Sequence, residues 1–501
     1  YPKKEALRRA LQKTDGKGQD RQRRKIIKQT GKDMIQFTPV SRENISRLAH
    51  YYSRCTYRIS DYSAGIKLMW KNASYEYAEV CGCLLVRSRW NGQYYFDYPV
   101  PDKGENGELC GDVAAALEAC GQYCAEHFIP FRLCNIPNCA VNKLLSCYPD
   151  FEIRTERNLD DYLYLAQDII RFEGKKYAGQ RNHIRKFHAL YPEAKFERFT
   201  TDDIPRIRAF WKKFGDRNTS AGAKTELKFA HAMTEYIGSP LFVAGGFTLH
   251  GEVISFCLSE ICGETLIDHI EKALPDFEGI YPATVQSFAE TFAQNVTYIN
   301  REDDAGSRGL RISKLQYQPM EILPKHTVHI KTPINRLKKV PIVKGENGIS
   351  LTPIQEKDIP DYNRLCLDDM RNRWWGYDYR SDCANPGRDY FYQDQKRDFM
   401  NRMAMNFAIR KDGKFVGEVI LYNFDFRGAA EIGVRILPEA DGQGIGRYAF
   451  SLTADYAIYQ LELSEIRGKC LKENVASAKM LSSVMQKTGE DEIYYYYRKI
   501  V

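Results

Sequence analysis

The residues best suited to chemistry lie near the end of the chain, where an apolar segment runs into a glycine-rich turn and then an amphipathic helix. The turn reads Asp441-Gly442-Gln443-Gly444-Ile445-Gly446. The start of a helix offers an anion several N–H groups without an intrahelical partner, together with the positive end of the helix dipole. Glycine lets the backbone approach that anion closely. The sequence therefore predicts a pyrophosphate site at residues 441–446.

A second group of reactive residue types, Asn300-Arg301-Glu302-Asp303-Asp304, follows an apolar strand-like segment. Further basic residues lie on both sides of it, namely Lys175, Lys176, Arg181, Arg185, Arg311 and Lys314. Such a set would suit a phosphate-rich donor such as the end of an aminoacyl-tRNA, with a carboxylate that orients the acceptor. An internal network of ion pairs would use the same residue types. Both interpretations remain open from sequence.

The elements that position the glycine turn form the clearest pattern in the chain. Residues 349–501 read as a strand (349–354), helices (358–370 and 388–403) and a meander of strands (405–411, 415–424 and 429–438) with a turn at 412–414. The turn and its helix come next, then a strand (465–471), a helix (475–486) and a last strand (492–500). A dinucleotide-binding fold would place such a turn after its first strand. Here it follows the fourth, which excludes that fold.

The rest of the chain divides into further blocks of mixed helices and strands. We expect a basic arm at 1–34, a first folded block at 35–165, a second at 166–330, and a Pro-, Gly- and Lys-containing linker at 331–348 before the last block. In the first block, 75–88 is strand-like and 112–128 has helical spacing. In the second, 174–192, 241–260, 264–273, 281–295 and 296–300 alternate between helix and strand patterns, with a hairpin turn at 249–252.

Charge is distributed unevenly along the chain. The formal net charge is +8, and residues 1–34 contain twelve basic and four acidic residues, whereas the remainder carries 61 of each sign. The arm could bind nucleic acid or an anionic membrane surface, or it could be a solvated helical segment. Because no apolar run approaches the roughly 20 residues that cross a bilayer, and no secretory signal is visible, we expect a cytoplasmic protein with at most peripheral membrane contact.

Fourteen cysteines are present, nine of them between Cys55 and Cys147. Several lie in apolar segments, such as Cys81 and Cys83, so free buried thiols in a reducing compartment explain them better than disulfides. The pairs Cys120/Cys124 and Cys134/Cys139 do not have the spacing of a zinc site, and no metal is expected.

The last block resembles the GNAT acetyltransferase superfamily along its whole length. The segments that carry the resemblance are Phe415–Glu418, Ala430–Val434, Gly442–Gly446 and Glu473–Ser477. In that family the glycine turn binds the pyrophosphate of acetyl-CoA, and two splayed strands hold the pantetheine arm. The resemblance thus implies cofactor contacts at Val434, Ile436, Gly442, Gln443, Gly444, Ile445, Gly446, Arg447, Asn474 and Ser477. Asp441 departs from the pattern, because Arg or Gln is commonest there, and a later Gly-Phe pair is replaced by Lys487-Thr488-Gly489-Glu490.

Residues of roughly 35–325 resemble the C-terminal aminoacyl-transferring domain of phosphatidylglycerol lysyltransferases and its soluble relatives. The matching segments are 174–187, 269–273 (which includes Glu271) and 299–319. That domain consists of two GNAT-like folds in tandem. The resemblance therefore implies an α+β chain with three GNAT-like folds, each a mostly antiparallel sheet flanked by helices. The membrane-spanning half of the lysyltransferases is absent from the sequence given.

Acetyl transfer to an amine requires positioned reactants, a base and stabilisation of the developing oxyanion. Glu431 is the candidate base and Tyr495, within the run Tyr494–Tyr497, the candidate proton donor, with backbone N–H groups near Gly433 to Arg435 for the oxyanion. A solvent-facing carboxylate and ordinary strand aromatics are the alternatives. Asn474 is also a good helix N-cap. Trp374, Trp375, Tyr377 and Asp378 could form a pocket for a cationic amine, or could simply pack.

Taken together, these residues predict an acyltransferase whose last block is a GNAT-type N-acetyltransferase that uses acetyl-CoA and acts on a small amine or an amino-acid-like acceptor. An aminoacyltransferase-like module precedes it, with Glu271, Arg301, Glu302, Asp303, Arg311 and Lys314 as its candidate site. One alternative is an aminoacyl-tRNA-dependent enzyme whose basic arm and middle module bind tRNA. Another is a non-catalytic binding scaffold in residues 35–330.

Overall fold

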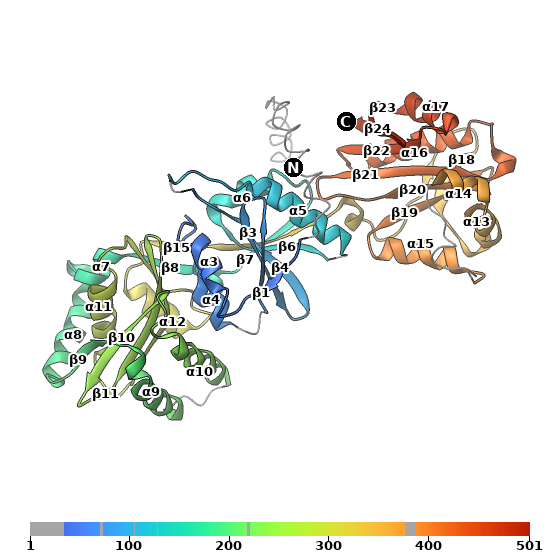
Figure 1. Ribbon diagram of the computed structural model, residues 1–501. Coiled ribbons are helices and arrows are strands. Elements are labelled where there is room, and N and C mark those ends of the chain that lie inside the picture. Colours follow the sequence, from blue (N-terminus) through green and yellow to red (C-terminus); the bar gives the residue numbers. More distant parts are fainter. Residues whose placement is uncertain are drawn as a thin grey trace. The chain divides into compact units, whose positions relative to one another are not determined.

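The computed structural model of the protein describes residues 35–70, 74–104, 106–127, 129–217, 221–375 and 387–500 (Figure 1). The predicted basic arm at 1–34 and two of the candidate pocket residues, Tyr377 and Asp378, lie outside these residues. The described chain forms two compact units. The first contains most of residues 35–329, and the second contains residues 330–500 with two short stretches at 124–130 and 143–152.

The first sheet has eight strands in the order β1-β2-β3-β4-β6-β16-β7, with β5 paired to β3. Its strands are β1 (Thr38–Pro39), β2 (Glu76–Val80), β3 (Cys83–Trp90), β4 (Gln93–Asp97), β5 (Val100–Pro101), β6 (Phe131–Pro137), β7 (Phe151–Thr155) and β16 (Lys325–Ile330). Its helices are α3 (Ile45–Tyr52), α4 (Ala64–Met69), α5 (Val113–Glu126) and α6 (Asn138–Leu145). The segment 75–88, which reads as one strand, is a hairpin instead. Cys81 and Gly82 both have positive φ and reverse the chain between β2 and β3.

The second sheet also has eight strands, in the order β11-β10-β12-β13-β14-β8-β15, with β9 paired to β10. The strands are β8 (Asp161–Leu165), β9 (Lys195–Arg198), β10 (Phe242–Leu249), β11 (Glu252–Val253), β12 (Ser255–Cys262), β13 (Thr265–Ala273), β14 (Tyr298–Asn300) and β15 (Glu321–Leu323). The helices are α7 (Ala166–Arg171), α8 (Ala178–Leu190), α9 (Ile204–Arg217), α10 (Ala221–Met233), α11 (Ile280–Phe292) and α12 (Arg308–Gln316). The predicted hairpin at 249–252 is confirmed.

The third sheet runs β17-β18-β19-β20-β21-β22-β24-β23. Its strands are β17 (Val343–Lys344), β18 (Ile349–Pro353), β19 (Ala404–Lys411), β20 (Lys414–Tyr422), β21 (Ala429–Ile436), β22 (Glu465–Leu471), β23 (Gln486–Glu490) and β24 (Tyr494–Ile500). Its helices are α13 (Ile359–Cys366), α14 (Asp369–Trp375), α15 (Tyr390–Met400), α16 (Ile445–Tyr459) and α17 (Val475–Val484). The predicted meander is confirmed. The region expected to be a linker contributes the buried side chains of Ile334 and Val343 to the core under α16.

Side chains that point alternately to the two sides of each strand give the third sheet an apolar surface on both faces. Ala430, Ile432 and Ile436 pack with α16 in one core, and a second core joins α13, α15 and residues such as Ala408 and Phe415. Because successive side chains on a strand point to opposite faces, Glu431 lies on the face of α13 and α14. The sheet is therefore covered on both sides by helices, as Figure 1 also shows.

All three sheets share one feature. An antiparallel meander is followed by a parallel pair: β4 with β6, β13 with β14, and β21 with β22. In each pair only two or three residues are in register before the strands separate. We call these points of separation the first, second and third forks. Three mostly antiparallel sheets flanked by helices confirm the predicted fold class.

Candidate functional site

The second fork is where the middle module gathers its charged side chains. β13 and β14 pair from Thr265/Tyr298 to Ile267/Asn300, and beyond this point β13 continues while the chain leaves β14 through Arg301. The guanidinium of Arg301 spans the gap. Its Nη2 atom donates to both carboxylate oxygens of Glu271 at 2.8 Å. The side chain of Arg301 is only 7% exposed, so this is a buried ion pair.

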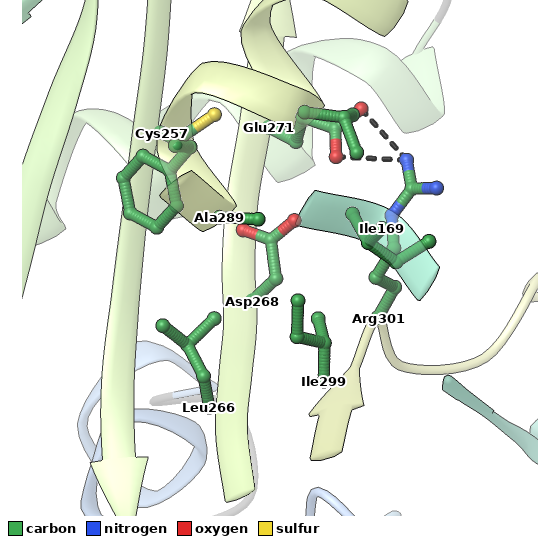
Figure 2. Close-up of a pocket in the computed structure, with 10 residues that line it drawn as sticks. Ile169, Cys257, Leu266, Asp268, Glu271, Ala289, Ile299 and Arg301 are labelled. Atoms are coloured by element: carbon green, nitrogen blue, oxygen red, sulfur yellow. Dashed lines mark hydrogen bonds and ion pairs between the residues drawn. The ribbon is translucent and has the colours of Figure 1, made fainter. Parts of the chain in front are cut away.

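Below this ion pair lies a small cavity with room for about one water molecule (Figure 2). Apolar side chains such as Ile169, Leu266 and Ile299 line it, and the carboxyl group of Asp268 points into it. Burial raises the pKa of Asp268 well above its usual range, and the neighbouring charge of Glu271 raises it further. Asp268 is therefore a carboxyl group whose protonated form is favoured by burial, and it accepts a hydrogen bond from the Ser259 hydroxyl at 3.2 Å.

The sequence did not identify Asp268 as a site residue. It lies next to the segment 269–273 that carries the family resemblance, and in the sequence it is one more polar residue in an alternating strand. Only its position opposite the gap between β13 and β14 distinguishes it. The signal that could have found it is a carboxylate directly after the apolar pair Leu266-Ile267 in a strand that carries His269 and Glu271 as further titratable residues.

The loop after β14 is held by charges from several elements. Glu302 has a left-handed backbone (φ +55°) and contacts the Nδ1 atom of His269 at 2.8 Å, while the His269 Nε2 atom lies 3.3 Å from Glu260. Burial alone lowers the pKa of His269, but the hydrogen bonds to Glu260 and Glu302 outweigh it and raise the pKa to about 10. The imidazole is therefore a cation held between two carboxylates.

The remaining candidate residues of the middle module are also paired internally. Arg311 binds Asp304 at 2.8 Å, which holds the pKa of that carboxyl well below its usual range. Lys314 donates to the backbone carbonyls of Arg301 and Asp303. Burial raises the pKa of Asp303 to about 6. The structure thus brings together Glu271, Arg301, Glu302, Asp303, Arg311 and Lys314 around one loop, in the kind of ion-pair network that was one of the two interpretations.

The upstream basic residues do not join this cluster. Lys176 pairs with Asp168 at 2.9 Å, and Arg181 donates to the carbonyls of Phe172 and Gly174. Arg185 lies on an exposed face of α8.

The third fork is built differently. β21 and β22 pair from Ala429/Glu465 to Glu431/Arg467 and then diverge. At the start of the divergence Lys469 Nζ lies 3.6 Å from a carboxylate oxygen of Glu431, with the lysine side chain 44% exposed. Asn423 donates to the other oxygen at 3.1 Å. Arg435 turns away from the fork, because it donates to Glu418 on β20 at 2.8 Å.

The glycine turn follows β21 as predicted. Gly442 and Gly444 have left-handed φ values of +73° and +74°, and a Cβ atom at either would meet nothing within 4 Å. Gly444 is the N-cap residue of α16. Because the first amides of a helix have no intrahelical acceptor, the turn presents N–H groups to open space. Ile445 is buried, whereas Gln443 and Arg447 are exposed.

Asp441 is tied to a neighbouring helix. One of its oxygens accepts the amide of Gly442 at 3.0 Å, and the other accepts Nη2 of Arg371 from α14 at 2.9 Å. The carboxylate at the start of the turn is therefore neutralised by an arginine that lies 70 residues earlier in the sequence.

The other candidate residues of the last block occupy distinct places. Asn474 caps α17, since its side chain accepts the amide of Ser477 at 3.0 Å, which confirms the predicted N-cap. Tyr495 packs against the core under α16 and α17, so it lies on the opposite face of the sheet from Glu431. The structure does not bring these two residues together. Tyr494 is on the same face as Glu431, and the centre of its ring lies 5.8 Å from Lys469 Nζ.

The two tryptophans already have cationic partners. The guanidinium carbon of Arg435 lies 4.6 Å from the centre of the Trp375 ring, and that of Arg373 lies 4.8 Å from the Trp374 ring. Trp375 also packs against Gly433, where a Cβ atom would lie 3.0 Å from the ring. Packing and internal cation–π contacts therefore account for both residues.

Cysteines and membrane-spanning segments add no further site. All thirteen cysteines in the described residues are free thiols, and no group of three or more His, Cys, Asp or Glu side chains in those residues could hold a metal ion. Over the same part of the chain, no helix is both long and apolar enough to cross a bilayer.

Comparison with known proteins assigns both modules. Residues 53–329 match the family model for the phosphatidylglycerol lysyltransferase C-terminal domain, and residues 349–487 match the acetyltransferase (GNAT) domain. A conserved protein of unknown function from Bacteroides thetaiotaomicron is 26% identical, covers 60% of this chain and all of its own, and superimposes with a TM-score of 0.53. A probable acetyltransferase is 20% identical over 32% of this chain and 98% of its own, with a TM-score of 0.28.

An uncharacterised protein from Mycoplasmoides gallisepticum is 24% identical over 183 residues, which are 36% of this chain. The chain spans 59% of the length of that relative. The lysyltransferase-type match covers more than half of the 501 residues. The protein therefore belongs to the phosphatidylglycerol lysyltransferase C-terminal family and carries a GNAT acetyltransferase domain after that module.

Proposed function

We propose that the C-terminal domain transfers an acetyl group from acetyl-CoA to the amine of a small or amino-acid-like acceptor. The observation that carries this proposal is the third fork, where β21 and β22 diverge and β21 leads directly into the glycine turn. When bound, acetyl-CoA would supply an activated thioester. The residues present suit it, because the turn is open at Gly442 and Gly444 and offers backbone amides rather than side chains.

Different groups of this chain would bind the cofactor, stabilise the oxyanion and accept the proton. The amides of residues 443–446 would hold the pyrophosphate, since the Gly442 amide already donates to Asp441, and the divergent segments 432–436 and 468–471 would lie along the pantetheine arm. Beyond Glu431 the backbone of β21 is no longer in register with β22, so its N–H groups on that side can stabilise a developing oxyanion. Glu431 stands at the fork and would accept the proton of the attacking ammonium.

The neighbours of Glu431 fit a proton-accepting role. The carboxylate is held by Asn423 and lies 3.6 Å from the exposed ammonium of Lys469, so it is fixed in position but not sealed from solvent. Tyr495 is on the other face of the sheet. We therefore assign protonation of the leaving thiolate to solvent or to a tyrosine on the face of Glu431 rather than to Tyr495.

Acetyl transfer by the full-length chain provides the test. Acetyl-CoA is incubated with a panel of amines, amino acids and peptides, and free CoA is detected with a thiol reagent. We expect amine-dependent CoA release and a loss of about 10²–10⁴-fold in kcat for Glu431→Gln. Glu465→Gln, which alters a carboxylate on the adjacent strand β22, is the matched control and should remain within about twofold. Absence of CoA binding at millimolar concentration would contradict the proposal.

We propose a second acyl-transfer site at the second fork, because the carboxyl group of Asp268 lies with Arg301 and Glu271 in a cavity lined mainly by apolar side chains, where burial raises its pKa. Such a group can donate a proton to the leaving oxygen of an ester. An aminoacyl ester such as that of an aminoacyl-tRNA is the donor class we propose. The Arg301–Glu271 pair spans this fork, so a substrate would have to displace it. If the pair stays closed, the module is a binding scaffold.

A further inference from the structure

The start of the glycine turn carries a charge that opposes the proposed ligand. Asp441 immediately precedes Gly442, and its side chain is 62% exposed at the mouth of the turn. A carboxylate beside a pyrophosphate is repelled by it unless a cation intervenes. Arg371 provides that cation, since its Nη2 atom lies 2.9 Å from Asp441 Oδ2.

Arg371 is held in place from both ends. Its backbone amide donates to Asp368 Oδ1 at 2.8 Å in the first turn of α14, and its guanidinium is anchored by Asp441. The side chain is 23% exposed, against 55% for Arg364, which also pairs with a carboxylate near the turn. Arg371 is therefore more restrained than an ordinary surface arginine.

The guanidinium of Arg371 still has donors to offer. Its Nε atom is buried and has no hydrogen-bond partner within the described residues, so the 23% of the side chain that is exposed lies elsewhere on the group. The anchoring contact with Asp441 uses Nη2 alone. Because a guanidinium presents several N–H groups in a planar fork that fits phosphate oxygens, the group can hold Asp441 and a phosphate at the same time.

From these contacts we propose that Arg371 is a binding residue for the pyrophosphate of the CoA ligand and that Asp441 positions it. This inference rests on the proposed acetyl-CoA site and adds a residue from α14 to it. The cation comes from a different element than the turn itself. Asp441 therefore serves as an anchor for the arginine rather than as a defect in the turn.

Calorimetric titration of the full-length chain with CoA tests the proposal. We expect Arg371→Ala to weaken CoA binding at least about tenfold, as for other hydrogen bonds to charged groups. Arg364→Ala removes a comparable arginine that pairs with Glu439 just before the turn, and it should change the affinity less than about twofold. Circular dichroism of each variant verifies that it is folded.

The double variant gives the sharper result. In Arg371→Ala the carboxylate of Asp441 is left without its partner and repels the phosphates. The double variant Arg371→Ala/Asp441→Asn should therefore bind CoA more tightly than Arg371→Ala alone. Additive weakening by the two changes would overturn the role of Asp441.

The choice of ligand identifies the phosphate and separates this inference from the proposal beneath it. Arg371→Ala should weaken CoA and dephospho-CoA equally and leave pantetheine unaffected. A loss confined to CoA would assign Arg371 to the 3′-phosphate and overturn the pyrophosphate contact. Normal CoA binding by Arg371→Ala would overturn this inference alone. Failure of the unmodified chain to bind CoA would overturn the acetyl-CoA site itself.

Discussion

The second and third forks have the same topology and opposite contents. At the second, Arg301 and Glu271 form a buried ion pair across the gap, and the cavity beneath it has room for about one water molecule. At the third, the ion pair between Lys469 and Glu431 is partly exposed, and Arg435 is drawn aside to Glu418. The same divergence of two parallel strands is therefore closed by a buried ion pair in one case and carries a partly exposed ion pair in the other, and a few side chains decide which.

The first fork extends this comparison. Tyr62 donates to the carbonyl of Asn135 on β6 at 2.8 Å and lies 3.2 Å from the carbonyl of Tyr98, just beyond β4. Asp97, the last residue of β4, forms a buried ion pair with Lys67 of α4, with Nζ and Oδ2 2.6 Å apart. The first fork is thus closed by a phenol and an ion pair. At the second fork β13 also leads to a helix with a left-handed N-cap glycine, Gly279, but a Cβ atom there would clash with the carbonyl oxygen of His183, whereas Gly442 and Gly444 face open space.

Stability should respond most strongly to changes at the closed second fork. Arg301→Met leaves Glu271 largely buried without its cation, and we expect a loss of about 3–5 kcal/mol in the free energy of unfolding of the first unit. Urea denaturation of the full-length chain, followed by far-ultraviolet circular dichroism, measures this loss. Lys469→Met at the open fork is the matched control and should cost less than about 1 kcal/mol.

The double variant Arg301→Met/Glu271→Leu makes the comparison sharper. Replacing both charges by apolar groups removes the unpaired buried charge, so the stability should return to within about 1–2 kcal/mol of the unmodified chain. If Arg301→Met and Lys469→Met have the same small effect, the second fork is not sealed by its ion pair.

The next largest effect is expected on the pH dependence of stability, to which Asp268 at the second fork should contribute. Because the pKa of Asp268 is raised in the folded state, the folded chain retains this proton while the unfolded chain releases it above a pH of about 4. Its contribution to stability is complete below that pH and is lost as the pH rises toward the folded pKa, at a slope of up to about 1.4 kcal/mol per pH unit.

Asp268→Asn should remove this slope and retain most of the packing. Asp303, with a pKa of about 6, contributes a slope of the same sign between pH 4 and 6 in both proteins, so the difference between them isolates Asp268. Denaturation midpoints at pH 4 to 8 provide the measurement. Parallel pH curves for the two proteins would show that Asp268 is ionised in the folded chain.

The smallest effect is expected at the first fork. Tyr62→Phe removes the hydroxyl contacts to Asn135 and Tyr98 and leaves the ring in place, so it should cost about 1–2 kcal/mol by urea denaturation. The Lys67–Asp97 pair remains, and the fork should stay closed. If this variant bound CoA through the first unit, the hydroxyl of Tyr62 would block a CoA-binding site rather than only stabilise the fold.

The local parts of the fold could be predicted from sequence. Alternating strands at 405–436, the tight turn at 412–414 and the glycine turn at 441–446 are encoded within a few residues, and all are found. The hairpin at Cys81-Gly82 was not predicted, because the apolar residues on both sides read as one continuous strand. Turn geometry with a positive φ at a cysteine leaves little trace in a hydrophobicity pattern.

The contents of the forks could not be predicted, because they depend on residues far apart in the chain. Tyr62 meets Asn135 across 73 positions, and Arg371 meets Asp441 across 70. The candidate residues of the middle module were identified by type, and their contacts come from the structure. Tyr495 was chosen from a run of four tyrosines without knowledge of the face that each occupies. Strand register alone decides that face.

The strand order of the first sheet has a consequence for how the protein is made. β16 (Lys325–Ile330) lies between β6 and β7, although the whole second sheet precedes it along the chain. During synthesis β6 and β7 leave the ribosome before β16, the strand that lies between them in the sheet. The first half of the module thus completes its sheet only after the second half has left the ribosome. The two halves therefore mature as one product, and a truncation between them would leave β6 with one unpaired edge and β7 without its neighbour in the sheet.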